Sequence, residues 1–236
     1  MFQRSEEVKE TYKGGRIEKT GKYIGVFEHV YQITSKSGSK AIHFDFVSNQ
    51  GESNSFDIYY WSAKSGENID FAMSIIQEQI MNILRVNQLK EKPNTIVQVY
   101  DFASGNMVDK SVVSYPGLEN KSVGIVFQET VYKRQTPKEN GEKFGSQFIP
   151  VKYFDAATGK TAYELVNKKE PEELEKYLAK LAPLFVPKNI RDEYEDRDEE
   201  AVHVNNKAQT QQPTATYMPP SSTQSSFDEF DDSIPF

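Results

Sequence analysis

Apolar and polar residues alternate with a period of two over three segments near the start of the chain, which is the pattern of half-buried β-strands. These segments are residues 22–34, 41–48 and 53–61. Turn-forming clusters separate them, so the three strands are expected to form a meander. In the third segment, the alternation assigns Phe56, Ile58 and Tyr60 to the core face. Tyr59 and Trp61 then lie together on the opposite face.

The apolar period changes to that of a helix over residues 69–86, with Asn68 as its candidate N-cap. Further strands are predicted at residues 95–103, 110–115, 122–133, 147–154 and 161–166, the last two as a hairpin. A second helix starts at Pro171 and buries Leu174, Leu178 and Leu181. This order predicts a mainly β fold with two helices, as an OB-like partly open β-barrel with insertions.

Outward-facing aromatic rings on such a barrel are candidates for stacking on nucleic-acid bases, because every base has a π-face. Tyr59 and Trp61 form one candidate pair, and Lys64 follows them in a Ser/Gly loop. The alternative for this pair is packing against the helix.

A second aromatic stripe lies on the first predicted strand and consists of Tyr23, Phe27 and Tyr31. The residues of the opposite face are Ile24, Val26 and Val30. One of the two faces must be core, and the alternation alone does not choose between them. The stripe is therefore a second candidate for contact with DNA.

Basic residues flank these aromatic segments and are candidates for contacts with phosphates. Lys36 and Lys40 surround the first predicted turn, and Lys133 and Arg134 begin a polar excursion over residues 134–145. Lysine-rich turns are often only solvated loops. As a set beside an aromatic face, these residues are compatible with a track for single-stranded nucleic acid.

Charge is distributed unevenly along the 236 residues. From Arg191 onward there are 3 basic and 11 acidic residues, a net charge of −8, whereas residues 1–190 carry a net charge of +1. Residues 201–226 contain one charged side chain, Lys207, and consist mostly of Asn, Gln, Thr, Ser, Ala and Pro. Such a composition buries too little apolar surface to fold, so we expect a disordered acidic tail. The predicted organisation is a domain at 1–190, an acidic segment with a flexible linker at 191–226, and a tip at 227–236.

The tip ends in a short peptide that joins acidic residues to an apolar anchor. Asp231 and Asp232 precede Ser233, and the chain ends in Ile234, Pro235 and Phe236. Pro235 favours an extended conformation, which suits capture of a C-terminal carboxylate by a partner. This ending resembles that of bacterial single-stranded DNA-binding proteins, Asp-Asp-Asp-Ile-Pro-Phe, with Ser233 as the one departure.

The resemblance implies a bacterial or phage protein that coats and protects single-stranded DNA in replication, recombination and repair. It also implies that Asp231, Asp232, Ile234, Pro235 and Phe236 recruit replication and repair proteins. The residue-level resemblance covers the tail alone, and the folded region is similar only in size and in the order of its strands. A competition between the acidic tail and DNA for the basic groove is a further hypothesis.

No pattern in the sequence indicates an enzyme, a cofactor or a metal site. There is no cysteine, and the histidines lack the spacing of metal ligands. Gly159-Lys160-Thr161 lacks the first glycine of a phosphate-binding loop. With no apolar run of membrane-spanning length and no visible signal peptide, we expect a cytoplasmic protein, in the bacterial host cell if a phage encodes it.

Two other functions remain open at this point. One is a single-strand annealing recombination protein, and the other is a non-DNA adaptor that docks through its tail. Self-association of the domain is compatible with all of these functions.

Overall fold

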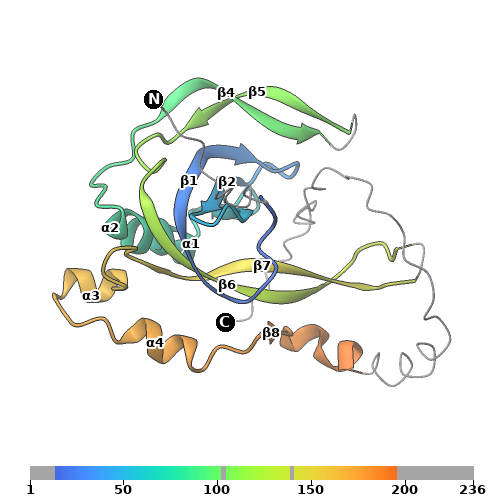
Figure 1. The fold of residues 1–236 in the computed structure, drawn as a ribbon. Helices are drawn as coiled ribbons and strands as arrows, with labels where there is room; N and C mark the ends of the chain where they lie inside the picture. The colour runs from blue at the N-terminus through green and yellow to red at the C-terminus, as the bar shows by residue number, and fades with distance from the viewer. Residues whose placement is uncertain (1–13, 102–104, 139–140, 196–236) are drawn as a thin grey trace, which may run out of the picture.

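The computed structural model describes residues 14–101, 105–138 and 141–195. Eight strands form one sheet that does not close (Figure 1): β1 (Gly21–Thr34), β2 (Lys40–Ser48), β3 (Ser53–Trp61), β4 (Lys92–Asp101), β5 (Asn106–Ser114), β6 (Ser122–Lys133), β7 (Phe144–Phe154) and β8 (Leu184–Phe185). The helical elements are α1 (Asp70–Ser74), η1 (Ile75–Ile80), α2 (Met81–Ile83), α3 (Ala162–Val166), α4 (Glu173–Leu178) and η2 (Lys188–Ile190). The prediction of a mainly β, partly open fold is confirmed.

The long strand β1 organises the sheet. β2 pairs with β1 from Gly25 to Thr34, β6 pairs with its first six residues, and β5 meets it at Tyr31. The strands β3-β2-β1-β6-β7 thus form a curved wall, whose open side lies between β3 and β7. There, Asn54 Nδ2 on β3 donates a hydrogen bond of 2.7 Å to the carbonyl oxygen of Phe148 on β7.

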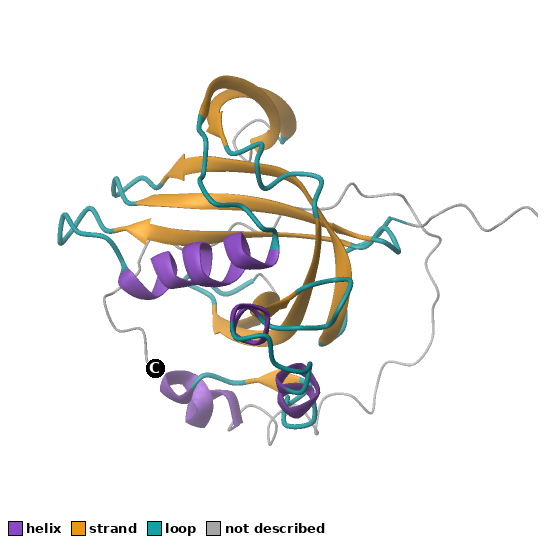
Figure 2. Cartoon of the chain, turned by 90° about the vertical axis from the view of Figure 1, so that its left-hand side faces the viewer, coloured by secondary structure: helices purple, strands orange, loops and turns teal. Residues whose placement is uncertain are grey.

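Aromatic rings fill the inside of this wall. Phe27, Phe44 and Phe127 are fully buried, and the rings of Phe44 and Phe56 are stacked at 5.2 Å. The continuous helical segment formed by α1, η1 and α2 packs Ile76, Ile80 and Ile83 into the same core. Figure 2 shows this helix lying against the strands. Its predicted apolar face is confirmed, but Asn68 is not its N-cap, because Ile69 occupies that position and no side chain caps the helix.

The hairpin of β4 and β5 is an addition outside the five-stranded wall. It lies over β1 (Figure 1) and contacts the wall through a small second core in which Val97 and Val112 pack around Tyr31. The other face of the hairpin carries exposed apolar side chains, among them Ile96 and Met107. The hairpin therefore covers part of the outside of β1.

Residues 161–166 do not form the predicted strand. Thr161 caps helix α3 in a reciprocal capping box: its hydroxyl accepts from the Glu164 N–H, and the Glu164 carboxylate accepts from the Thr161 N–H at 2.8 Å. The Thr-x-x-Glu spacing is a helix-start signal that outweighs the β-branched residues of this segment. The turn before α3 is tight, with Gly159 at a φ of 71°.

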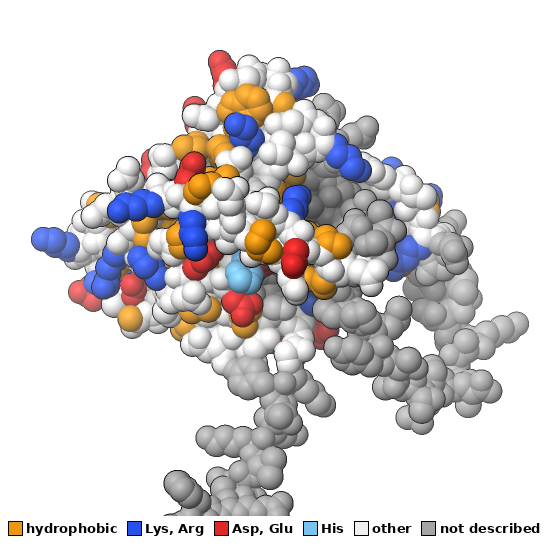
Figure 3. Space-filling model, turned by 90° about the horizontal axis from the view of Figure 1, so that it is seen from above, with side chains coloured by type: hydrophobic (Ala, Val, Ile, Leu, Met, Phe, Trp, Pro, Cys, Tyr) orange, Lys and Arg blue, Asp and Glu red, His pale blue; other side chains and the backbone are white. Residues whose placement is uncertain are grey.

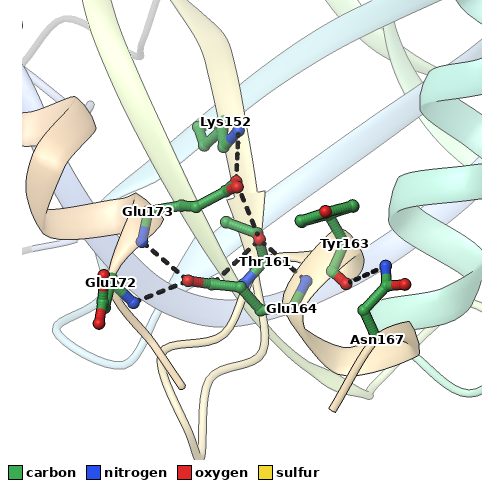
Figure 4. A network of polar contacts seen from close by, with 7 residues as sticks. All are labelled: Lys152, Thr161, Tyr163, Glu164, Asn167, Glu172 and Glu173. Carbon is green, nitrogen blue, oxygen red and sulfur yellow. Dashed lines mark hydrogen bonds and ion pairs between the residues drawn. The ribbon is translucent and has the colours of Figure 1, made fainter. Parts of the chain in front are cut away.

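The Glu164 side chain also joins α3 to the start of α4 (Figure 4). Its second carboxylate oxygen accepts hydrogen bonds from the N–H groups of Glu172 and Glu173, at 2.7 and 2.8 Å. Burial alone would raise the pKa of Glu164, but these bonds and those from Thr161 outweigh it and lower the pKa to about 2. The predicted second helix is confirmed in α4, which packs Leu174, Leu178 and the following Leu181 against β6 and β7.

No helix in residues 14–101, 105–138 and 141–195 is long and apolar enough to cross a membrane. The predicted acidic tail beyond residue 195 lies outside the described residues, including all five candidate partner-binding residues: Asp231, Asp232, Ile234, Pro235 and Phe236.

Candidate nucleic-acid interface

The alternation predicted for β3 is confirmed as far as Tyr60. Ile58 is buried and Phe56 and Tyr60 pack against the main core, so that Tyr59 lies on the opposite side of the strand.

A β-bulge breaks this alternation at the end of β3. Tyr59 pairs with Ala41 whereas Trp61 pairs with Lys40, so Tyr60 is the extra residue. Trp61 therefore does not share the side of Tyr59 and lies on the side of Lys40. Tyr59 and Trp61 are both partly exposed.

A lysine lies over the tryptophan at the end of β3. Lys40 pairs with Trp61 across the β2–β3 ladder, and its Nζ is 5.4 Å from the centre of the Trp61 ring. This distance is within the range of a cation–π interaction.

Two loops meet beside this pair and carry the other lysines. The β1–β2 turn holds Lys36, and the loop after β3 holds Lys64. The loops are tied together because the Ser39 hydroxyl accepts a hydrogen bond of 3.1 Å from the Ala63 N–H. The structure thus gathers Trp61 and three predicted lysines at the end of the β2–β3 ladder, with Tyr59 on the other side of β3. We call this group the Trp61 end: Lys36, Lys40, Tyr59, Trp61 and Lys64.

The prediction that Tyr23, Phe27 and Tyr31 form one stripe on a single face of the strand is wrong. Phe27 pairs with Phe46 whereas His29 pairs with Asp45, so Glu28 is the extra residue of a β-bulge. The bulge exchanges the two faces of β1 halfway along its length. Phe27 is therefore fully buried, and Tyr31 lies on the outer side.

Neither end of that stripe forms an open stacking surface. Tyr31 is 5% exposed because the β4–β5 hairpin covers it. Tyr23 lies on the inner side with Phe27, its ring 5.9 Å from that of Phe127, and its hydroxyl donates to the carbonyl of Lys19 at 2.8 Å. Of the five aromatic candidates, Tyr59 and Trp61 are the two that are partly exposed and not packed against the main core.

A charged cluster occupies the middle of the same outward surface. His43 on β2 contacts Asp57 on β3 through Nδ1 at 2.6 Å, and Asp45 through Nε2 at 3.1 Å. The Ser55 hydroxyl donates to Asp45 at 2.6 Å, and the Tyr31 ring lies 4.8 Å from the imidazole. The alternation along β2 puts His43 and Asp45 on the side opposite the core. The cluster itself was not predicted, because it depends on the cross-strand register of His43 with Asp57.

Burial alone would lower the pKa of His43, but the hydrogen bonds and attraction of Asp45 and Asp57 outweigh it and raise the pKa to about 9. The imidazole is therefore a cation at neutral pH, and both ring nitrogens donate. One cation between two carboxylates leaves the cluster with a net negative charge. Phosphate groups are disfavoured here, whereas the uncharged faces and edges of bases are tolerated.

Lys133 and Arg134 lie elsewhere, at the β6–β7 hairpin, and both are engaged within the protein. Lys133 Nζ contacts Glu193 at 2.7 Å. Arg134 donates to the carbonyl of Phe144 at 3.0 Å and lies 5.5 Å from the Tyr132 ring. Arg134 is thus a structural part of the hairpin, and Lys133 is available to DNA only by exchanging its ion-pair partner.

The lysines of the Trp61 end are separated from Lys133 and Arg134 along the direction of β3. Trp61 ends that strand, whereas Asn54 near its start contacts β7 at Phe148. Seven residues of extended strand span roughly 23 Å. Basic and acidic side chains are intermixed on the face seen in Figure 3, and no single large basic patch dominates it.

One hollow of the described structure is unsuited to phosphate. It has a volume of about 630 Å³ and lies between the helical segment and the inner side of β3. Tyr60, Tyr115 and Met73 are among its lining residues, and Glu91 is the charged one. Among the residues that the structure describes, no group of three or more His, Cys, Asp or Glu side chains is arranged to hold a metal ion.

A scan against protein-family models finds no match for this chain, and neither does a search of curated proteins.

Proposed function

We propose that this chain binds single-stranded DNA without regard to its sequence, through the end of the β2–β3 ladder. The observation that carries the proposal is the Trp61 end. A partly exposed tryptophan has a lysine ammonium 5.4 Å from its ring centre and two lysine-bearing loops beside it, and Tyr59, also partly exposed, lies on the other side of the same strand. Aromatic platforms with adjacent cations are the general solution for holding single strands.

The chemistry assigns different parts of the nucleotide to different parts of this surface. Trp61 offers a ring face to one base, Tyr59 on the other side of the strand offers one to another, and each stacked base contributes about 1–3 kcal/mol. Lys36, Lys40 and Lys64 attract the phosphates between those bases. Because the His43 cluster is net negative, the backbone is expected to follow the lysine loops, with the bases directed inward.

The second part of the proposed function rests on the sequence of the tip. Its acidic residues and its Ile-Pro-Phe ending resemble the tip through which bacterial single-stranded DNA-binding proteins recruit replication and repair proteins. Phe236→Ala should therefore abolish partner recruitment and leave DNA binding intact. Loss of both activities together would contradict this division of labour.

The direct test is titration of the full chain with oligo(dT) and with duplex DNA of equal length, across a series of salt concentrations. Trp61 is the one tryptophan of the chain, so its fluorescence reports on the proposed site itself. We expect quenching by the single strand, preference over duplex, and log K that falls linearly with log salt, by roughly 0.7 for each phosphate contact.

A charge variant tests where the phosphates bind. Changing Lys36 and Lys40 together to Gln should reduce the salt slope by about 1.4, since two contacts are lost. The matched control changes Lys168 and Lys180, two exposed lysines beside α3 and α4, and should leave the slope unchanged. Equal affinity for single strand and duplex, or no binding at low salt, would refute the proposal and favour the adaptor function.

A further inference from the structure

Strand β4 forms an exposed end of the sheet. It is the last strand of the path β3-β2-β1-β5-β4, and within the described part of the chain it pairs with β5 alone. Residues 95–100, Thr-Ile-Val-Gln-Val-Tyr, contain no charged residue, no proline and no glycine. An uncharged edge of high β-propensity presents a row of backbone N–H and C=O groups to any strand that can pair with it.

The opposite end of the same path is protected. Ser53 at the start of β3 exchanges backbone hydrogen bonds with the preceding chain, accepting from Ile17 at 3.0 Å and donating to Gly15 at 2.8 Å. Asn54 is tied to β7, and Trp61 forms a bridge to Asn68. On β4, the features that discourage pairing occupy only its first residues, Lys92, Pro93 and the left-handed Asn94.

The outward face of the β4–β5 hairpin carries exposed apolar side chains among the polar residues Gln98, Asp109 and Ser111. Val97 and Val112 point toward Tyr31, and the alternation places Ile96 on the other side, where it is 61% exposed. Met107 on β5 is 55% exposed. A two-stranded hairpin that is packed on one face only is weakly stabilised on its own. Another strand along β4 would both complete the ladder and cover this surface.

We infer that β4 pairs antiparallel with β4 of a second copy of this chain, about a two-fold axis near the middle of the strand. The strand begins at Lys92 and ends at Asp101. Antiparallel self-pairing brings the basic start of each copy to the acidic end of the other, whereas parallel pairing opposes like charges. A two-fold axis also satisfies both exposed edges at once and stops growth at a dimer. This inference does not depend on the proposed DNA-binding function.

The experiment measures the mass of the DNA-free full chain by sedimentation velocity over a range of concentrations. The wild-type protein is expected to approach twice the mass of the chain as concentration rises. Ile96→Lys should weaken self-association by about tenfold or more, because it places two like charges close to the axis. The matched control is Val166→Lys on α3, an apolar residue of similar exposure, 63%, that should leave the dimer intact.

A charge-complementation experiment separates pairing at the axis from a general defect. Copies with Ile96→Lys and Ile96→Glu, carrying different affinity tags, should form a mixed dimer although each alone is weakened. A wild-type chain that stays monomeric at every soluble concentration would overturn the inference. A dimer unaffected by Ile96→Lys, or one that complementation fails to restore, would overturn it equally, because the interface would then lie elsewhere.

Discussion

The middle and the end of strand β3 both carry aromatic side chains, yet they differ in what those side chains contact. In the middle, Phe56 stacks on Phe44 and is surrounded by Phe27 and Phe127. At the end, beyond the bulge, Trp61 has the ammonium of Lys40 over its ring and no place in the main core. The comparison separates rings that stabilise the fold from a ring outside the core that we propose binds a ligand, although they lie on one strand.

The largest effect is expected from the inner face. Phe44→Ala removes a fully buried ring from an aromatic cluster and should reduce the free energy of unfolding by about 3–5 kcal/mol. Urea denaturation measures this loss. The control is Phe71→Ala, since the Phe71 ring is 59% exposed and its loss should change stability by about 0.5 kcal/mol or less. Similar losses for the two variants would mean that burial does not distinguish them.

An intermediate effect is expected from the charged cluster of the outer face. The pKa of His43 is raised to about 9, so the folded protein retains a proton that the unfolded chain releases above a pH of about 6.5. This stabilisation is fully present below that pH and is lost as pH rises through 9. The free energy of unfolding should therefore fall between pH 6.5 and 9, at most by about 1.4 kcal/mol per pH unit.

Denaturation of the wild type and of His43→Gln across that pH range provides the measurement. The variant should lack the His43 part of the slope, because Gln carries no titrating proton. Identical pH profiles would show that Asp45 and Asp57 do not hold His43 in its charged form.

The smallest effect on stability, and the sharpest test of the comparison, is expected from Trp61→Ala. It should weaken binding of oligo(dT), followed by anisotropy of a labelled oligonucleotide, by about 1–3 kcal/mol for a lost stacked base. The matched control is Tyr60→Phe, which removes the inner hydroxyl bonded to Gln32 and leaves every ring in place. If Tyr60→Phe weakened DNA binding as much as Trp61→Ala, the division between the core rings and the ring at the end of β3 would be wrong.

Local sequence patterns were sufficient to predict the segments whose structure depends little on residues distant in the chain. Strands β2 and β3 and the first helix follow from periods of two and of three to four residues, and the outward position of Tyr59 follows from the same alternation. The position of Trp61 does not follow from it, because a bulge at Tyr60 breaks the alternation. The helix α3 was missed although Thr161 and Glu164 carry its capping signal, because the β-branched residues nearby favoured a strand.

Long-range register decided the rest. The bulge at Glu28 exists only in the pairing of β1 with β2, and it alone determines that Phe27 is buried and that Tyr31 lies on the outer side of β1. His43 meets Asp57, and Lys133 meets Glu193, across separations of 14 and 60 residues. Sequence periodicity reports which residues share a face of one strand. Which neighbour covers that face, and which charges meet on it, depends on how strands distant in the chain align, and that is a property of the folded sheet.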